Sequence, residues 1–292
     1  MSMFSLTERG ATGDGTTLET AVLQKAIDDC HSGGGGMVRV PAPLKMLVGS
    51  IVMKSNVELH VERGAQILGT DDIAKYTEPA FPGGESHQRR GWALIVADGA
   101  ENIAFSGGGV IDGNGRGYVV EADRYHLKMS RRRPQLIRLT NCRNVTFRDV
   151  TCRDSASWAM NLSGCEDVAI SGIRILNDLR LPNCDGIDPD HCRNVRISDC
   201  HIQAGDDCIV IKNCAEHADG GPSENIVVTN CVLCSTSSAV KIGTESSDDF
   251  RNILFDNCIV RSSNRGLAVQ LRDSGNVENV MFSNCVVETR HF

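Results

Sequence analysis

Three aspartates near the middle of the sequence have the residue type and spacing of an acid-base site. Asp185 lies in the segment N-C-D-G-I-D, and Asp206 and Asp207 follow 21 and 22 residues later in G-D-D-C-I. If this interval is one coil of a repeating β-structure, the three carboxylates lie on one face, because neighbouring coils stack about 4.8 Å apart. Crowded carboxylates shift one another's pKa values and can thereby provide an acid and a base at neutral pH.

A short pattern recurs along the chain and predicts the elements that position these aspartates. Each copy starts with Asn or Asp and an apolar residue and continues with apolar and polar residues in alternation. Copies begin at Asn56, Asn102, Asn144, Asp167, Asn194, Asn225, Asn252 and Asn279, and the intervals from Asn144 onward are 23, 27, 31, 27 and 27 residues. Repeats of this length without helices between them indicate a parallel β-helix, with the asparagines stacked at a tight left-handed turn.

The N-terminal segment is predicted to cover the first coil. Thr16 and Glu19 fit a capping box, and Leu18, Val22 and Ala26 form an apolar stripe. We therefore expect a helix over 17–30 within a cap of about 1–36, and a single β-helix domain over 1–292. The repeat pattern stops within a strand at the C-terminus, so we expect further coils or a cap after residue 292 in the complete protein.

Two insertions in the early repeats are expected to build a binding groove. They span 76–91 and 113–134, and loops on a solenoid tend to project on one side. Five of their arginines could meet an acidic ligand or could form an ordinary solvated surface: Arg89, Arg90, Arg131, Arg132 and Arg133.

Composition argues against several classes of partner. The 292 residues carry a formal net charge of -7, and aromatic residues make up only 4%. A nucleic-acid partner is therefore not expected, because it would require a basic surface or aromatic stacking platforms. No apolar run is long enough for a membrane span or a signal peptide. The sequence thus predicts no membrane partner and a cytoplasmic location, or secretion if an export signal has been removed.

Thirteen cysteines follow the repeat instead of forming obvious pairs. Those at equivalent positions of successive repeats are expected to stack as buried, reduced thiols, since free cysteine behaves as a small apolar residue. Cys231 and Cys234 have a metal-like spacing, but no second pair lies at a suitable distance for zinc. We expect neither a metal nor another cofactor.

Later repeats place more polar residues beside the three aspartates. We expect a substrate-binding set of Asn183, Ser238, Lys241, Glu245, Arg265, Gln270 and Arg272. Lys241 follows Ser238 by three positions, so strict alternation turns it to the opposite face, and only a bend would bring it into the groove. Single aspartates in turns usually cap their own backbone, which is the expectation for Asp188, Asp190 and Asp199.

These segments resemble glycoside hydrolase family 28, the polygalacturonase-like enzymes of the pectin lyase-like superfamily. The likeness rests on N-C-D-G-I-D and G-D-D-C-I and extends to the N-terminal G-A-T-G-D-G, to S-N-V-E-L-H-V-E-R-G-A and to I-D-G-N-G. It implies a right-handed, single-stranded parallel β-helix that hydrolyses O-glycosidic bonds of a pectic or other plant-type polysaccharide with inversion. Asp206 would be the general acid, and Asp185 with Asp207 would activate water. Inverting sites usually separate acid and base by about 6.5 to 9.5 Å.

Two motifs of that family are altered in this chain. The histidine of G-H-G is replaced by Ser238, and R-I-K falls on Ala268-Val269-Gln270. Both cations that would hold a galacturonate carboxylate are therefore missing from their places, and each lost charge-assisted hydrogen bond costs about 1.5 to 3 kcal/mol. Lys241, Arg265 and Arg272 are predicted to rebuild the groove, which makes a glycan other than galacturonan a possible substrate.

Two alternative functions stay open at the level of sequence. In a β-helix polysaccharide lyase, the three aspartates would hold Ca²⁺ through hard oxygen ligands while a basic residue removes a proton. In a catalytically impaired carbohydrate-binding homologue, the same carboxylates would only accept hydrogen bonds from sugar hydroxyls.

Overall fold

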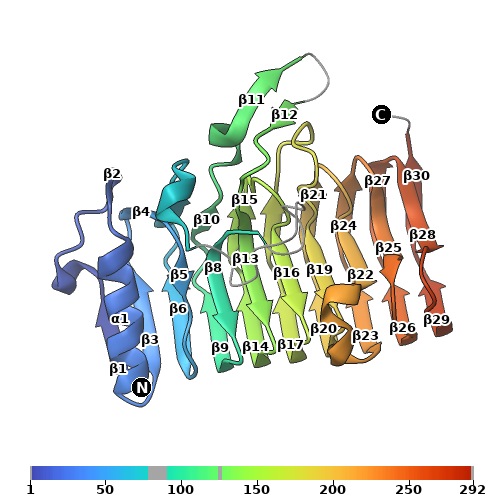
Figure 1. Cartoon of the computed structure of the whole chain (residues 1–292), viewed down its shortest axis with the longest axis horizontal. Coiled ribbons are helices and arrows are strands. Elements are labelled where there is room, and N and C mark those ends of the chain that lie inside the picture. Colours follow the sequence, from blue (N-terminus) through green and yellow to red (C-terminus); the bar gives the residue numbers. More distant parts are fainter. Residues whose placement is uncertain (1, 78–90, 124–126, 291–292) are drawn as a thin grey trace.

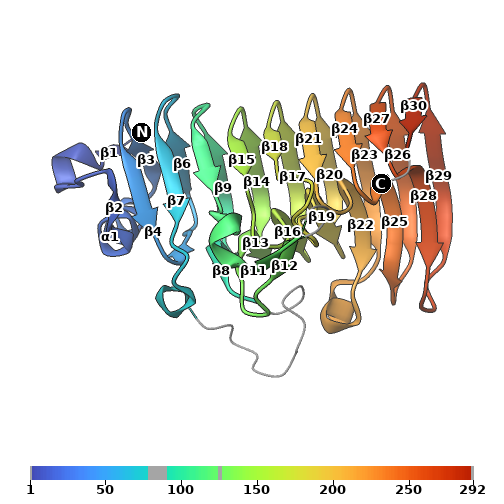
Figure 2. The ribbon, with the colours of Figure 1, turned by 90° about the horizontal axis from the view of Figure 1, so that it is seen from above.

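The computed structural model describes residues 2–77, 91–123 and 127–290, and it winds them into coils stacked along one axis (Figure 1). Each complete coil contributes one strand to each of three parallel sheets. Seen from above, the coils lie side by side from the N-terminal to the C-terminal end (Figure 2). The architecture is a parallel β-helix.

Each of the three sheets is built from strands at equivalent positions in successive coils. The first contains β1 (Ser2–Ser5), β3 (Gly36–Val40), β6 (Val57–Val61), β9 (Glu101–Ser106), β14 (Arg143–Arg148), β17 (Glu166–Ser171), β20 (Arg193–Ser198), β23 (Ser223–Thr229), β26 (Phe250–Asp256) and β29 (Val277–Ser283). The second contains β2 (Asp14–Leu18), β4 (Lys45–Val48), β7 (Gln66–Gly69), β10 (Val110–Asp112), β15 (Thr151–Arg153), β18 (Arg174–Leu176), β21 (His201–Ala204), β24 (Val232–Ser235), β27 (Ile259–Ser263) and β30 (Val286–Thr289). The third contains β5 (Ile51–Val52), β8 (Ala93–Asp98), β13 (Gln135–Thr140), β16 (Met160–Ser163), β19 (Ile187–Asp190), β22 (Ile209–Asn213), β25 (Ser238–Ser246) and β28 (Arg265–Leu271).

The interior of the solenoid is a stack of apolar side chains in register. Val145 pairs with Val168, which pairs with Val195 in the next coil, and the rings of Phe105 and Phe147 stack at 4.5 Å between centroids. The cysteines are free and mostly buried in these rows, as the sequence predicted. Burial of such rungs stabilises the fold by about 25 cal/mol for each Å² of apolar surface removed from water.

The repeated asparagines form a ladder along one edge of the first sheet. Asn194, Asn225, Asn252 and Asn279 all have φ between 53° and 57°, and each amide from Asn225 onward donates to the side-chain oxygen of the asparagine one coil before. The predicted stacking at a left-handed turn is confirmed. Asparagine suits this position because its short polar side chain tolerates the left-handed region better than most residues do.

The two long early intervals each contain one coil with an insertion. β6 pairs directly with β9, and β9 pairs directly with β14, so among the described residues each interval adds one strand to the first sheet. The second insertion forms η3 (Gly115–Tyr118) and an antiparallel hairpin of β11 (Val119–Ala122) and β12 (Leu127–Met129). This hairpin projects from the top of the solenoid in Figure 1.

The N-terminal cap differs in detail from the sequence expectation. Helix α1 covers Thr20–Ser32, three residues later than predicted at its start, because Leu18 pairs with Leu47 in the second sheet. The predicted capping box is wrong: the Glu19 carboxylate accepts hydrogen bonds from the backbone of Thr12 and Gly13. The buried face of α1 is Leu23, Ala26, Ile27 and Cys30.

The remaining short helices lie between strands at the edge of the solenoid. They are η1 (Thr7–Arg9), η2 (Ile73–Lys75) and η4 (Ala215–Gly220). Within the described part of the chain, no helix is long and apolar enough to cross a membrane.

The asparagine ladder gives a stability prediction at Asn225. Asn225→Ala and Asn225→Gly both remove the ladder amide. Both residues must adopt the left-handed φ of 57° at this position, but only alanine is strained by it. We expect the alanine variant to be less stable than the glycine variant by about 1 to 2 kcal/mol, measured from urea unfolding. Equal stability of the two variants would show that the turn geometry does not constrain this position.

Candidate active site

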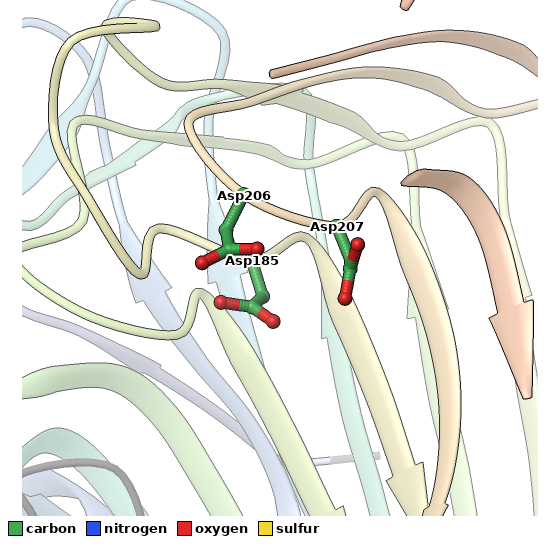
Figure 3. A group of neighbouring side chains, drawn as sticks. All are labelled: Asp185, Asp206 and Asp207. Carbon is green, nitrogen blue, oxygen red and sulfur yellow. The ribbon is translucent and has the colours of Figure 1, made fainter. Parts of the chain in front are cut away.

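The three predicted aspartates meet at the start of two neighbouring strands in the third sheet. Asp185 lies in the turn before β19, and Asp206 and Asp207 lie in the turn before β22. The Gly186 N–H donates to the Asp207 carbonyl at 2.9 Å, so the two turns are stacked directly on each other. One carboxylate oxygen from each aspartate lies within 4.8 Å of one from each of the others (Figure 3). This spacing is closer than the expected 6.5 to 9.5 Å.

Two glycines allow these turns to approach so closely. A Cβ on Gly186 would lie 2.2 Å from the Cys208 carbonyl oxygen, and a Cβ on Gly205 would lie 2.1 Å from the Leu181 carbonyl oxygen. Both distances are far below a van der Waals contact, so any side chain would push the coils apart. The glycines of N-C-D-G and G-D-D are therefore required by packing between coils.

Asp207 is the carboxyl group that the site keeps ionised. Its Oδ2 accepts from Lys241 Nζ at 2.9 Å, and its Oδ1 accepts from the Ser238 N–H at 2.8 Å. Burial acts to raise the pKa of Asp207, but the charge and hydrogen bond of Lys241 outweigh burial and leave the pKa below its ordinary value. Asp207 is therefore suited to accept a proton near neutral pH.

The pKa of Asp206 is shifted in the opposite direction. Burial, followed by the negative charge of Asp207, raises its pKa above the ordinary value. It is the one member of the trio with partial solvent exposure, whereas Asp185 and Asp207 are 3% and 2% exposed. A partly exposed carboxylic acid can reach the oxygen of a leaving group, as a general acid must.

The pKa of Asp185 is shifted in the same direction as that of Asp206. Burial first, then the charges of Asp188 and Asp206, raise its pKa well above the ordinary value. Its Oδ1 has no hydrogen-bond partner among the described residues. Within the cluster the pKa values of Asp185 and Asp206 are thus raised and that of Asp207 is lowered, which favours Asp207 as the ionised member.

Lys241 reaches the cluster because strand alternation is broken once. Ala239 and Val240 both belong to the apolar core, and Ile242 follows them there. Two consecutive inward residues bring Lys241 back to the outer face that Ser238 also occupies. The bend on which the sequence expectation depended is therefore present.

Lys212 is a charged residue beside the site that sequence reasoning missed. Its Nζ lies 3.2 Å from Glu245 Oε2, 3.8 Å from Asp188 Oδ1 and 4.9 Å from the centre of the Trp158 ring. Burial acts to lower the pKa of Lys212, but the surrounding carboxylates, Asp188 first, outweigh it and raise the pKa. The available signal was a single lysine at the end of the apolar run I-V-I.

The three aspartates expected to cap their own turns have other roles, so that prediction was wrong. Asp188 is fully buried, and its Oδ1 lies 3.8 Å from Lys212 Nζ. Asp190 accepts from the Cys214 N–H in the next coil at 2.8 Å. Asp199 accepts from the Asn230 amide in a second ladder. In-register stacking offers each carboxylate a partner one coil away.

The predicted substrate-binding residues divide into three groups. Asn183, Ser238 and Lys241 bond directly to the aspartates. Arg265 bonds to the hydroxyls of Ser237 and Ser238.

The remaining predicted residues lie further from the carboxylates. Glu245 contacts Lys212, and Arg272 lies 3.7 Å from Glu245. Gln270 is exposed on β28 opposite Gly243.

The arginines of the long loops also differ in their placement. Arg131 and Arg132 are exposed, whereas Arg133 is 4% exposed. Arg89 and Arg90 lie outside the described residues.

A calcium site at the three aspartates fits this geometry poorly. The carboxylate oxygens are hard ligands within 4.8 Å of one another, as Ca²⁺ prefers. However, Lys241 Nζ already bonds Asp207 Oδ2 at 2.9 Å, and its charge would repel a divalent cation. The donor set therefore favours proton transfer over metal binding.

Comparisons with known proteins match this chain to a described family. The family model for glycosyl hydrolases family 28 matches residues 30–290. A probable polygalacturonase of Vitis vinifera is 34% identical over 257 residues, which cover 83% of this chain and 52% of that protein. The chain spans about half the length of the curated relatives it matches.

Solved structures show the same architecture. A hyperthermoactive exopolygalacturonase from Thermotoga maritima is similar with a TM-score of 0.83 and 27% identity, covering 97% of this chain and 75% of that chain. A family 28 exopolygalacturonase from Yersinia enterocolitica gives a TM-score of 0.78 at 19% identity, covering 97% and 65%, and this likeness concerns the fold alone. The predicted right-handed, single-stranded parallel β-helix is confirmed.

The buried cation behind the cluster gives a testable prediction. Lys212→Met removes the positive charge that faces Glu245 and Asp188, and breaking a buried pair in this way costs about 3 to 5 kcal/mol. The raised pKa of Lys212 means that its contribution is complete at neutral pH and is lost only as the pH rises through that pKa. The loss caused by the variant should shrink at acidic pH, where the two carboxyls become neutral.

Chemical unfolding at pH 7 and at acidic pH checks this expectation. Lys128→Met is the matched control, because the Lys128 ion pair with Glu121 has both side chains 70% exposed. A Lys212→Met protein as stable as the control variant at pH 7 would contradict the electrostatic role.

Proposed function

The chain belongs to family 28 of the glycosyl hydrolases, and from this premise we propose that it hydrolyses O-glycosidic bonds of a polygalacturonate-type polysaccharide. The observation that carries the proposal is a cluster of three carboxyls in which two neighbours have pKa values shifted in opposite directions. The pKa of Asp206 is raised and that of Asp207 is lowered, while their side chains share one face with Asp185. Paired carboxyls with separated pKa values are the requirement of glycoside hydrolysis.

Each carboxyl has a distinct task in the proposed reaction. Asp206 donates its proton to the glycosidic oxygen as the bond from that oxygen to the anomeric carbon breaks. A water attacks the same carbon from the opposite side and gives its proton to ionised Asp207. Asp185, whose raised pKa favours the protonated form, orients the water. The product then has the inverted anomeric configuration.

The close spacing of the carboxyls is compatible with this single displacement. A water that makes two hydrogen bonds of about 2.8 Å can bridge oxygens up to about 5.5 Å apart. The oxygens of Asp185 and Asp207 are within 4.8 Å. This separation is short enough for one water to hydrogen-bond to both carboxyls.

Arg265 is the residue best placed to recognise a carboxylate on the sugar. Lys241 is committed to Asp207, and Arg272 faces Glu245 and Asp273. Arg265 is exposed, and its guanidinium donates hydrogen bonds to the hydroxyls of Ser237 and Ser238. These two serines lie one coil beyond Asp207. Arg265 thus offers a positioned cation to the sugar next to the cleaved bond, which supports an acidic substrate.

Hydrolysis of polygalacturonate tests the proposal. The wild-type chain should release new reducing ends without an unsaturated product, and NMR should detect the inverted anomer first. Asp206→Asn should lower kcat by about 10² or more, because it removes the general acid. Asp199→Asn is the matched control, since Asp199 belongs to an exposed ladder where asparagine is the usual residue.

The alternative functions predict different results in the same assay. An ultraviolet-absorbing unsaturated product that disappears with a chelator would identify a lyase. Binding of oligogalacturonides without turnover by the wild-type chain would identify a carbohydrate-binding protein. Either result would contradict the proposed hydrolysis.

A further inference from the structure

The hairpin that projects from the solenoid is attached to the loop that leads to Asp185. Tyr118, Leu127 and Met129 from the hairpin region form a small apolar cluster with Leu181 and Cys184. The Leu127 N–H also donates to the Arg180 carbonyl. The hairpin therefore has a fixed position relative to the residues that precede the acid-base cluster.

Arg133, just after this hairpin, is buried and points at that loop. Arg131 and Arg132 are exposed, but Arg133 is 4% exposed. Its guanidinium donates to the Ser130 carbonyl at 3.1 Å and to the Asn183 Oδ1 at 3.0 Å. Burial lowers the pKa of Arg133, yet arginine remains charged in proteins.

Asn183 continues the chain of hydrogen bonds to Asp206. Its Nδ2 donates to Asp206 Oδ2 at 3.3 Å. A side-chain amide has a donor end and an acceptor end, and a guanidinium can only donate. Arg133 therefore fixes the Asn183 amide with its oxygen toward the guanidinium and its N–H₂ toward Asp206.

We propose that Arg133 is a positioning residue for the general acid, acting through the orientation of the Asn183 amide. With Oδ2 accepting from Asn183, the acidic proton of Asp206 is carried on Oδ1 and stays available to the leaving group. If the amide turned over, its carbonyl would face Asp206 and would accept that proton itself. This inference rests on the proposed function of Asp206.

Leaving-group dependence distinguishes this role from a structural one. We compare polygalacturonate with a 2,4-dinitrophenyl galacturonide, whose leaving group departs without protonation and so does not need a general acid. Arg133→Met should lower kcat on polygalacturonate by about tenfold or more, within the range of acid catalysis, and should change kcat on the aryl glycoside little. Arg196→Met, at an exposed position on β20 in the first sheet, is the matched control.

The pH profile provides a second readout. Activity is lost at alkaline pH as Asp206 loses its proton, so the alkaline limb follows the pKa of Asp206. An N–H donor to the carboxylate lowers this pKa, and a turned amide would remove that donor. In Arg133→Met the alkaline limb should therefore move to higher pH. Arg133→Lys keeps a cationic donor and should retain most of the wild-type profile.

A second variant, Asn183→Gly, keeps the proposal falsifiable if Arg133→Met is unstable, and where both fold the two form a double-mutant cycle. Asn183→Gly removes the amide but suits the left-handed φ of 58° at this position, and it should show the same leaving-group dependence. Arg133→Met in the Asn183→Gly background should then cost little more, because both residues act through one hydrogen bond.

Three outcomes would overturn the positioning role while hydrolysis by the wild type stands. They are an equal loss on both substrates, an unchanged alkaline limb, or additive effects of the two substitutions. If the wild-type chain cleaves neither substrate, the proposed function itself fails, and the role of Arg133 fails with it.

Discussion

In-register stacking of parallel strands is the constraint on which the rest of this structure depends. Each coil repeats the backbone of the previous one at a spacing of about 4.8 Å. Residues at equivalent positions of successive coils therefore become neighbours, whatever their separation in sequence. Ser238 pairs with Arg265 across the third sheet, and the turns of Asp185 and Asp207 are joined by backbone hydrogen bonds. The same register that stacks valines in the core stacks carboxylates at the groove.

Stacking like charges is unfavourable, and the structure offsets it with two buried lysines. Lys241 bonds Asp207 directly, and Lys212 lies behind the cluster against Glu245 and Asp188. Because the lysines are closer to some carboxyls than to others, they separate the pKa values and do not lower all of them equally. The same two lysines thus offset the repulsion between the carboxylates and determine which carboxyl is suited to be the acid and which the base.

Much of the fold and of the central site could be predicted from the sequence, because both follow from periodicity. The repeated Asn positions predicted the stacked strands. The spacing of 22 residues in sequence between Asp185 and Asp207 predicted that their side chains lie close together. The helix start was misplaced because pairing of Leu18 with Leu47 is a contact between coils.

The details that the sequence did not give depend on side chains that no repeat marks. Lys212 is one charged residue in an apolar strand, and Asp188 looked like any aspartate in a turn. Lys241 faces the groove only because Ala239 and Val240 both turn inward. Such contacts depend on one bend or one neighbour, whereas the repeat pattern averages over many residues.

The pH dependence of kcat/KM on polygalacturonate, for the wild type and for Lys241→Met, tests most directly whether stacked neighbours divide the roles of the carboxyls. Asp207 must be ionised to act as the base, so activity is lost as the pH falls through its lowered pKa. Without the Lys241 charge that pKa rises, and the acidic limb should move to higher pH, while Lys241→Arg should keep it near the wild-type position. An acidic limb that stays in place in Lys241→Met would contradict this account.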